Sequence, residues 1–275
     1  MSARTVAAWS GACLVIVLTT TNPAYKAAVL LIAFTVLVSS VGLTRMRRLL
    51  AGVGFITVFD VTLNFVSAHL GATVLYSLPD SVPALGGPYT LEGLAFGVSA
   101  ALTIAGALLA AAPFSLLLAP HDVMDGLPRA LASTGTAIAA SLNLVPSIAR
   151  SFTDVSEAQR MRGWRPRGPA SWADVVVPVV LTSAEGSIQL AESMEARGFG
   201  SGPRTRYERA RLTIRDWIVI VSAAAAVSGF LAARMFGWAA DWSAYPSLQP
   251  PAVDLRAFGA CLLLLVPVVA WRRRV

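Results

Sequence analysis

Two Arg-Gly pairs are the residues of this sequence whose type and setting best suit binding chemistry. Arg162-Gly163 lies in the segment EAQRMRGW, and Arg197-Gly198 lies in the segment AESMEARGFG. A guanidinium donates paired, charge-assisted hydrogen bonds to a carboxylate. A glycine directly after the arginine lets the chain turn away without a side chain that blocks close approach. The two pairs therefore predict two binding sites of the same kind.

Each pair ends a segment that follows the same plan. A Val-Pro pair begins a helix-compatible run, at Val145-Pro146 in the first segment and at Val177-Pro178 in the second. Proline is favoured in the first turn of a helix and glycine just after the last turn, so we predict two capped helices that open at these prolines. The plan is thus duplicated within residues 141–203, although the two helices differ in length.

Both predicted helices are amphipathic. Their apolar residues recur at three- and four-residue spacing, which favours helices that lie along a membrane surface or pack on each other. The predicted faces are Val145, Ile148, Phe152, Val155 and Gln159 in the first helix, and Val177, Val180, Leu181, Ala184, Ile188, Ala191 and Met194 in the second. A purely structural pair of helices also explains the pattern, because the helix dipole favours arginine near a C-terminus and glycine caps it.

The composition places these helices in a membrane protein. Of the 275 residues, 56% are hydrophobic and only 13% are charged, about half the charged fraction of a soluble domain. Several apolar runs approach the roughly 20 residues that span a bilayer. We predict an all-α integral membrane protein with about six transmembrane helices plus two long cytoplasmic amphipathic helices. The predicted spans are residues 6–20, 27–43, 49–68, 91–119, 217–236 and 255–271.

Basic residues predict the orientation in the cell membrane. The predicted regions are N-terminal transmembrane helices at 1–119, a cytoplasmic region at 120–216 and C-terminal transmembrane helices at 217–275. With the N-terminus inside, 19 of the 22 basic residues lie on the inner side, as cytoplasmic loops require. Both termini are therefore predicted to be cytoplasmic. Since this topology accounts for the net charge of +7, we predict the lipid bilayer and no nucleic acid as a partner.

Polar and small residues in the predicted spans allow more than one interpretation. Asp60 is costly inside a membrane and suggests an ion or proton path, but Asn64, one turn away, offers a local partner and favours a structural contact. Gly93 and Gly97 have the GxxxG spacing of close helix contacts. They mark either a surface for a partner protein or internal packing.

Catalytic motifs are missing from the sequence. It has no GxxxxGK[ST] nucleotide loop, no nucleophile elbow, no HExxH and no paired carboxylates in the membrane. We therefore predict a non-catalytic protein without a cofactor or metal site. If ATP drives its work, another chain must bind the nucleotide.

The paired motifs resemble a family signature. The T component of energy-coupling factor (ECF) transporters, which includes the transmembrane subunit of cobalt and nickel uptake systems, carries Ala-Arg-Gly at the tip of each of two coupling helices. The second motif is complete and begins at Ala196, whereas the first has Met161 where the family has alanine. We call residues 161–163 the first tip and residues 196–198 the second tip.

The resemblance implies a scaffold of an ABC importer. In that family the coupling helices dock on two cytoplasmic ABC ATPases, and the membrane face holds a substrate-binding S component for a vitamin or a transition-metal ion. Arg162 and Arg197 are then the coupling residues. Glu157, Glu192 and Glu195 lie near the tips and are expected to brace the arginines.

Two other classes of function remain open. A stand-alone secondary transporter would use Asp60 as its ion-coupled residue and would tolerate changes at Arg162 and Arg197. A membrane anchoring or assembly protein would bind a cytoplasmic partner without ATP-dependent uptake.

Overall fold

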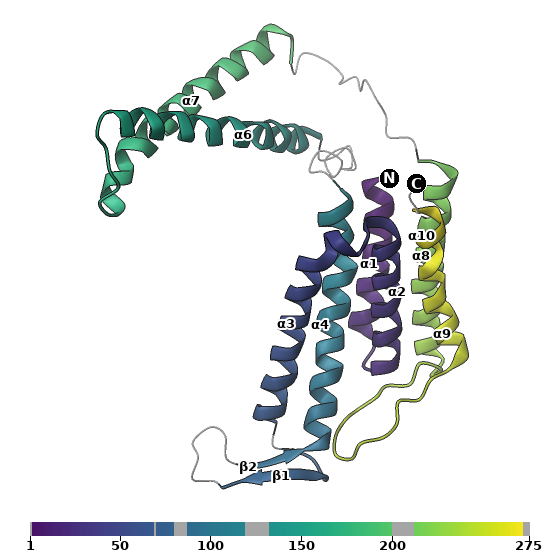
Figure 1. Ribbon diagram of the computed structural model, residues 1–275. Coiled ribbons are helices and arrows are strands. Elements are labelled where there is room, and N and C mark those ends of the chain that lie inside the picture. The colour runs from purple at the N-terminus through teal and green to yellow at the C-terminus, as the bar shows by residue number, and fades with distance from the viewer. Residues whose placement is uncertain (1, 69, 80–86, 119–131, 200–211, 272–275) are drawn as a thin grey trace. The chain divides into compact units, whose positions relative to one another are not determined.

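The computed structural model of the chain describes residues 2–68, 70–79, 87–118, 132–199 and 212–271, drawn as ribbons in Figure 1. The chain divides into two compact units. We call residues 1–123 with 211–275 the bundle unit, and residues 124–210 the insert unit. The parts of the predicted cytoplasmic region at 120–131 and 200–211, and the arginines at 272–274, lie outside the described residues.

Helices build the bundle unit. Helix α1 packs against α2, α4 and α8, and α4 also packs against α3. All six predicted spans are helical here, so the predicted all-α membrane fold is confirmed. The helices are α1 (Ala3–Thr19), α2 (Pro23–Val41), α3 (Leu43–Ser67), α4 (Leu91–Leu117), α8 (Ile214–Met235), α9 (Leu255–Leu262) and α10 (Val266–Ala270), with a 3-10 turn, η3 (Leu263–Leu265), between the last two.

Aromatic side chains join the two ends of the sequence in the core of this unit. The indole Nε1 of Trp9 donates a hydrogen bond to the carbonyl of Leu264 at 2.9 Å. The Tyr25 ring lies edge-on to Phe230 with 5.5 Å between centroids. All four side chains are fully buried. Because buried rings contribute large apolar areas, these contacts fix α1 against η3 and α2 against α8.

Five helices are long and apolar enough to cross a membrane, as judged by length and composition within the described residues. Four belong to the bundle unit, namely α2, α3, α4 and α8, with mean hydropathies of 1.9 to 2.1. The fifth is the helical segment 169–196 of the insert unit, at 1.2. Helix α1 and the α9–α10 segment are shorter apolar helices. The chain is therefore a multi-pass membrane protein.

The region between α3 and α4 differs from the loop that the sequence predicts at 69–90. Strands β1 (Val74–Leu78) and β2 (Gly87–Thr90) pair antiparallel and form a small hairpin. The carboxylate of Glu92, at the start of α4, accepts hydrogen bonds from the Thr73 amide and hydroxyl. This contact between Thr73 and Glu92 holds the hairpin on α4. It joins residues that are distant in the sequence, so no local sequence pattern predicts it.

The GxxxG pair at Gly93 and Gly97 serves internal packing. A Cβ at Gly97 would lie 3.0 Å from the Cβ of Asn64, and one at Gly93 would lie 3.0 Å from the carbonyl oxygen of Ala68. Both neighbours belong to the α3 side of the α3–α4 contact. The glycines therefore allow α3 and α4 to approach closely, and the alternative of a partner surface is not needed at these two positions.

Asp60 has the local partner that the sequence predicts. The Asn64 side-chain amide donates to the Asp60 carbonyl oxygen at 2.9 Å and to Oδ1 at 3.2 Å. The second carboxyl oxygen, Oδ2, is buried and has no hydrogen-bond partner among the described residues. The predicted structural contact is thus present, but it uses only one of the two oxygens of the Asp60 carboxyl group.

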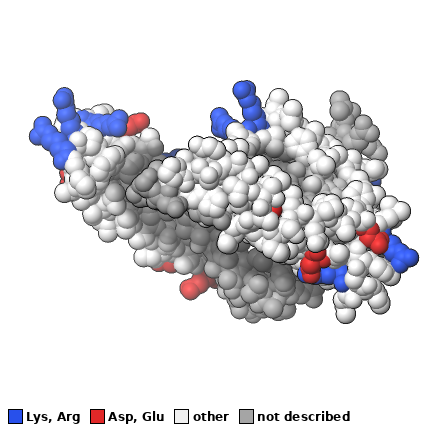
Figure 2. Space-filling model, turned by 90° about the horizontal axis from the view of Figure 1, so that it is seen from below, with Lys and Arg blue, Asp and Glu red and all other residues white. Residues whose placement is uncertain are grey.

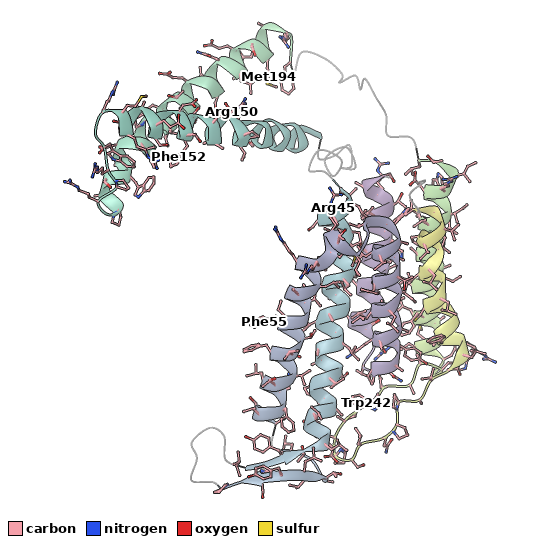
Figure 3. All side chains as sticks on the ribbon, in the orientation of Figure 1. Arg45, Phe55, Arg150, Phe152, Met194 and Trp242 are labelled. Carbon is pink, nitrogen blue, oxygen red and sulfur yellow. The ribbon has the colours of Figure 1, made fainter. Side chains whose placement is uncertain are left out.

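One end of the bundle unit collects the features predicted to be cytoplasmic. Helix α1 begins and α10 ends at the same end of the bundle (Figure 1). Arg45, in the basic segment 44–48, lies at that end too, whereas Trp242 lies at the opposite end (Figure 3). Both terminal helices and Arg45 therefore share one end of the bundle unit, and the side of the membrane on which that end lies stays a prediction.

The insert unit consists of α6 (Ala132–Met161), the 3-10 turn η2 (Pro169–Trp172) and α7 (Ala173–Ala196). The two long helices that the sequence predicts are present, but the prediction that prolines open them is wrong. Pro146 and Pro178 lie inside α6 and α7. Each proline removes only one backbone hydrogen bond, so the bonds on either side of it continue the helix.

Candidate functional site

The first tip closes α6 with a left-handed glycine. The Trp164 amide donates to the Gln159 carbonyl at 2.9 Å, and the Gly163 amide donates to the Arg160 carbonyl at 3.0 Å. Gly163 has a φ of 87°, a conformation that residues with a side chain rarely adopt. This is a Schellman helix end, in which Arg162 is the C-cap residue.

The second tip repeats the same geometry at the end of α7. The Phe199 amide donates to the Met194 carbonyl at 2.9 Å, and the Gly198 amide donates to the Glu195 carbonyl at 2.8 Å. Gly198 has a φ of 76°. Arg197 is again the C-cap residue, at φ −85° and ψ 5°. The glycine caps that the sequence predicts are therefore confirmed at both helix ends.

The equivalence extends to the side chains around each arginine. Met161 and Ala196 are the last helical residues, and Trp164 and Phe199 follow the glycines. Met161 is 84% exposed, so the methionine that departs from the family pattern extends from the helix end instead of packing on it. The two helix ends thus share one backbone conformation but carry different apolar side chains, Met161 and Trp164 at the first tip and Ala196 and Phe199 at the second.

Both arginines are available for a partner. Arg162 and Arg197 are exposed, and neither side chain makes a hydrogen bond or ion pair with any residue in the described ranges. The predicted bracing is not seen, since in the described part of the chain neither Glu157 nor Glu195 pairs with either arginine. The guanidinium groups can therefore form bidentate bonds with a carboxylate without first breaking an internal contact.

Charge differs between the two tips. Residues 157–167 hold four arginines and one glutamate, whereas residues 192–199 hold one arginine and two glutamates. All four arginines of the first group are exposed. Figure 2 shows Lys and Arg side chains gathered over the α6–α7 connection, at the left of the view. A partner at the first tip meets a locally basic surface, and a partner at the second tip does not.

The predicted apolar faces are only partly covered within the insert unit, since Val145 and Ile148 on α6 are exposed, like most of the predicted stripe on α7. Phe152 and Gln159 of the predicted α6 face contact the segment at the start of α7. On α7, however, the buried side chains are Val175 and Val179, whereas the predicted stripe, including Ile188 at 60%, is exposed. The helix buries a different face because the α6–α7 crossing covers only its first turns.

Sequence reasoning missed an aromatic group at the connection between the two helices. Trp164 and Trp172 lie edge-on to each other, and Trp172 stacks on Phe152. The available signal was the aromatic residue that follows each Arg-Gly pair, Trp164 in one copy and Phe199 in the other. Within the described residues, no group of three His, Cys, Asp or Glu side chains is arranged to hold a metal ion.

Known proteins share these features of the sequence. Residues 1–207, which include both tips, match the family model CbiQ, described as a cobalt transport protein. A curated relative from Bacillus selenitireducens, energy-coupling factor transporter transmembrane protein EcfT, is 27% identical over 233 residues, which cover 76% of this chain and 84% of the relative. The chain therefore belongs to the CbiQ family of cobalt transport proteins, and the predicted resemblance to the T component of ECF transporters is confirmed.

Proposed function

We propose that this chain is the transmembrane coupling subunit of an ECF-type ABC importer. It transmits the motion of two cytoplasmic ATPases to a membrane-embedded S component that binds the substrate. The observation that carries the proposal is the pair of equivalent helix ends in a chain of the CbiQ family. Each end has an exposed arginine that pairs with no residue in the described ranges, followed by a left-handed glycine.

The docking chemistry rests on Arg162 and Arg197. Each guanidinium binds a carboxylate in a groove of one ATPase, and the glycine behind it turns the chain away from the contact. Because both side chains are exposed and unpaired within the described residues, binding costs no internal ion pair. Charge-assisted bonds of this type contribute about 1.5–3 kcal/mol each.

The distance between the tips suits two ATPase subunits. The first tip lies near the start of α7 and the second at its end, and the 24 residues of α7 rise about 36 Å along its axis. Two contacts that far apart on one chain fit two lobes of an ATPase dimer better than a single groove. The chain itself hydrolyses no ATP in this proposal.

The substrate class follows from the family alone. We infer uptake of a transition-metal ion or a vitamin, chosen by the S component rather than by this chain. The insert unit and the basic end of the bundle unit then face the cytoplasm, because the ATPases are there.

The proposal is tested by co-purification from the native membrane. Tagged wild type is compared with Arg162→Glu plus Arg197→Glu and with the matched control Arg150→Glu plus Arg215→Glu, which makes the same charge change at exposed positions away from the tips. We expect wild type and control to retain ABC ATPases, and the tip variant to lose them while remaining folded. Mass spectrometry of a small co-purifying membrane protein then identifies the S component.

Retention of the ATPases by the tip variant would remove the coupling role and leave the arginines as helix caps. A second candidate, a stand-alone transporter that uses Asp60, is favoured by one observation, the buried Oδ2 without a hydrogen-bond partner in the described part of the chain. Substitution at Asp60 separates the two functions, because only the stand-alone transporter needs its carboxyl group.

A further inference from the structure

Side-chain contacts hold the connection between α6 and α7 in place. Three aromatic side chains, which we call the aromatic clamp, come together there, namely Phe152 of α6, Trp164 after the first tip and Trp172 at the end of η2. Trp172 stacks on Phe152 with 6.0 Å between centroids and 14° between planes. Trp164 lies edge-on to Trp172 at 5.4 Å and 74°. Figure 3 labels Phe152 at this connection.

Hydrogen bonds hold the same segment. The Trp164 indole donates to the Ser171 carbonyl at 2.9 Å, which ties the residue after the first tip to η2. The Ser171 hydroxyl accepts from the Arg167 amide at 2.9 Å and donates to the Gly168 carbonyl at 2.8 Å. From the other side, the Gln159 side chain donates to the Asp174 carbonyl at 3.1 Å, so α6 is bonded to the first turn of α7.

The residue after the second tip makes no such aromatic contact among the described residues. Phe199 occupies the position equivalent to Trp164, yet it is 54% exposed, and no ring contact joins it to a residue within the described ranges. The first tip is therefore fixed to the beginning of α7, while the second tip is simply the far end of the same helix.

We propose that the aromatic clamp makes the first tip and α7 one rigid lever, so that a displacement of Arg162 by one ATPase moves Arg197 with it. Phe152, Trp164 and Trp172 are then positioning residues for coupling, and they do not themselves contact the ATPase. The inference rests on the proposed function for its biological meaning, but the rigidity of the lever does not depend on any partner.

The rigidity is tested by double electron–electron resonance, which measures the distance between two spin labels in the full chain. Spin labels are placed at Thr153→Cys on α6 and Glu185→Cys on α7, both exposed, in a background where the buried Cys13 and Cys261 are replaced by alanine. We expect one narrow distance distribution in the parent chain and a clearly broader one in Trp172→Ala and in Phe152→Ala. Trp217→Ala, an exposed tryptophan of α8, is the control and should leave the distribution unchanged.

The consequence for coupling is tested in vesicles that hold the complete transporter. We expect Trp172→Ala to retain its ATPases and their ATP hydrolysis, whereas uptake per ATP falls several-fold, because loss of the two ring contacts loosens the first tip from α7. Trp172→Phe keeps an aromatic ring against Phe152 and should restore most of the coupling. A merely structural role would lower uptake and hydrolysis together.

Three results would overturn the lever. An unchanged distance distribution in both alanine variants would show that the clamp does not set the geometry. An unchanged uptake per ATP would show that coupling does not need it, and loss of the ATPases from Trp172→Ala would place the clamp in the docking surface itself. Failure of the proposed function looks different, because the tip variant Arg162→Glu plus Arg197→Glu then keeps its ATPases whatever the clamp variants do.

Discussion

Arg162 and Arg197 occupy the same position at the ends of α6 and α7, each as the C-cap residue in front of a glycine with positive φ. The amides of the glycine and of the residue after it donate to equivalent carbonyls at both ends, and the Arg162 and Arg197 amides donate to the equivalent carbonyls of Ala158 and Ser193. Because the frame is the same, changes at the two tips are comparable, and differences in their effects report on the surrounding side chains.

Gly163 is required for its conformation and not for space. A Cβ at Gly163 would meet no atom within 4 Å, but its φ of 87° is unfavourable for alanine. We expect Gly163→Ala to cost about 1–2 kcal/mol at the helix end and to weaken ATPase co-purification, and Gly198→Ala to act in the same direction. Thermal unfolding in detergent and co-purification measure the two effects.

Gly186 provides the matched control for this prediction. It lies in the interior of α7, where an added Cβ also meets no atom within 4 Å. Alanine there should stabilise the helix by about 1 kcal/mol and leave co-purification unchanged. If Gly186→Ala and Gly163→Ala destabilise equally, the left-handed caps are not the reason that the tips need glycine.

Asp60 separates the coupling function from a stand-alone transporter. We expect Asp60→Asn to retain ATP-dependent uptake within about two-fold of wild type, because an amide keeps an oxygen for the Asn64 side chain and removes a costly charge from the membrane. Uptake into cells that express the complete transporter measures this. Abolished uptake in Asp60→Asn, with normal uptake in Arg197→Glu, would support the secondary transporter instead.

Gly97 tests the close approach of α3 and α4. A side chain there must displace Asn64, whose Cβ lies 3.0 Å from the built Cβ position. We expect Gly97→Leu to destabilise the bundle unit by about 1–3 kcal/mol through overpacking. Gly54→Leu on α3 meets open space and should change stability little. Unfolding temperatures in detergent compare the two, and equal losses would rule out the packing explanation.

Lys26 and Ser99 form a buried polar pair between α2 and α4. The Lys26 ammonium donates to the Ser99 hydroxyl at 3.0 Å and to its carbonyl at 3.3 Å, and Lys26 is only 8% exposed. Ser99→Ala should cost about 1.5–3 kcal/mol, because a charged donor loses one of its two acceptors. In the Lys26→Met background the same change should cost clearly less. Additive losses in this double-mutant cycle would show that the pair is not coupled.

Features that depend on residues close in the sequence agree with the predictions, whereas features that depend on contacts between distant residues do not. The glycine caps follow from residues within one helical turn of each other, and they are as the sequence predicts. Proline was a poorer guide, because a proline costs a long helix only one hydrogen bond and Pro146 lies well inside α6. The face that α7 buries, at Val175 and Val179, depends on where α6 crosses it. Hydrophobic periodicity carries no information about that crossing.

The sequence by itself determined the membrane class, the helical runs, the two Arg-Gly helix ends and the family, because composition, spacing and capping are local properties of the chain. Tertiary structure decided which contacts those elements make. In the folded chain Gly97 packs against Asn64, and Lys26 donates a hydrogen bond to Ser99. Trp164 contacts Trp172, which stacks on Phe152. Such contacts join residues from different elements, and their geometry exists only once the helices have packed.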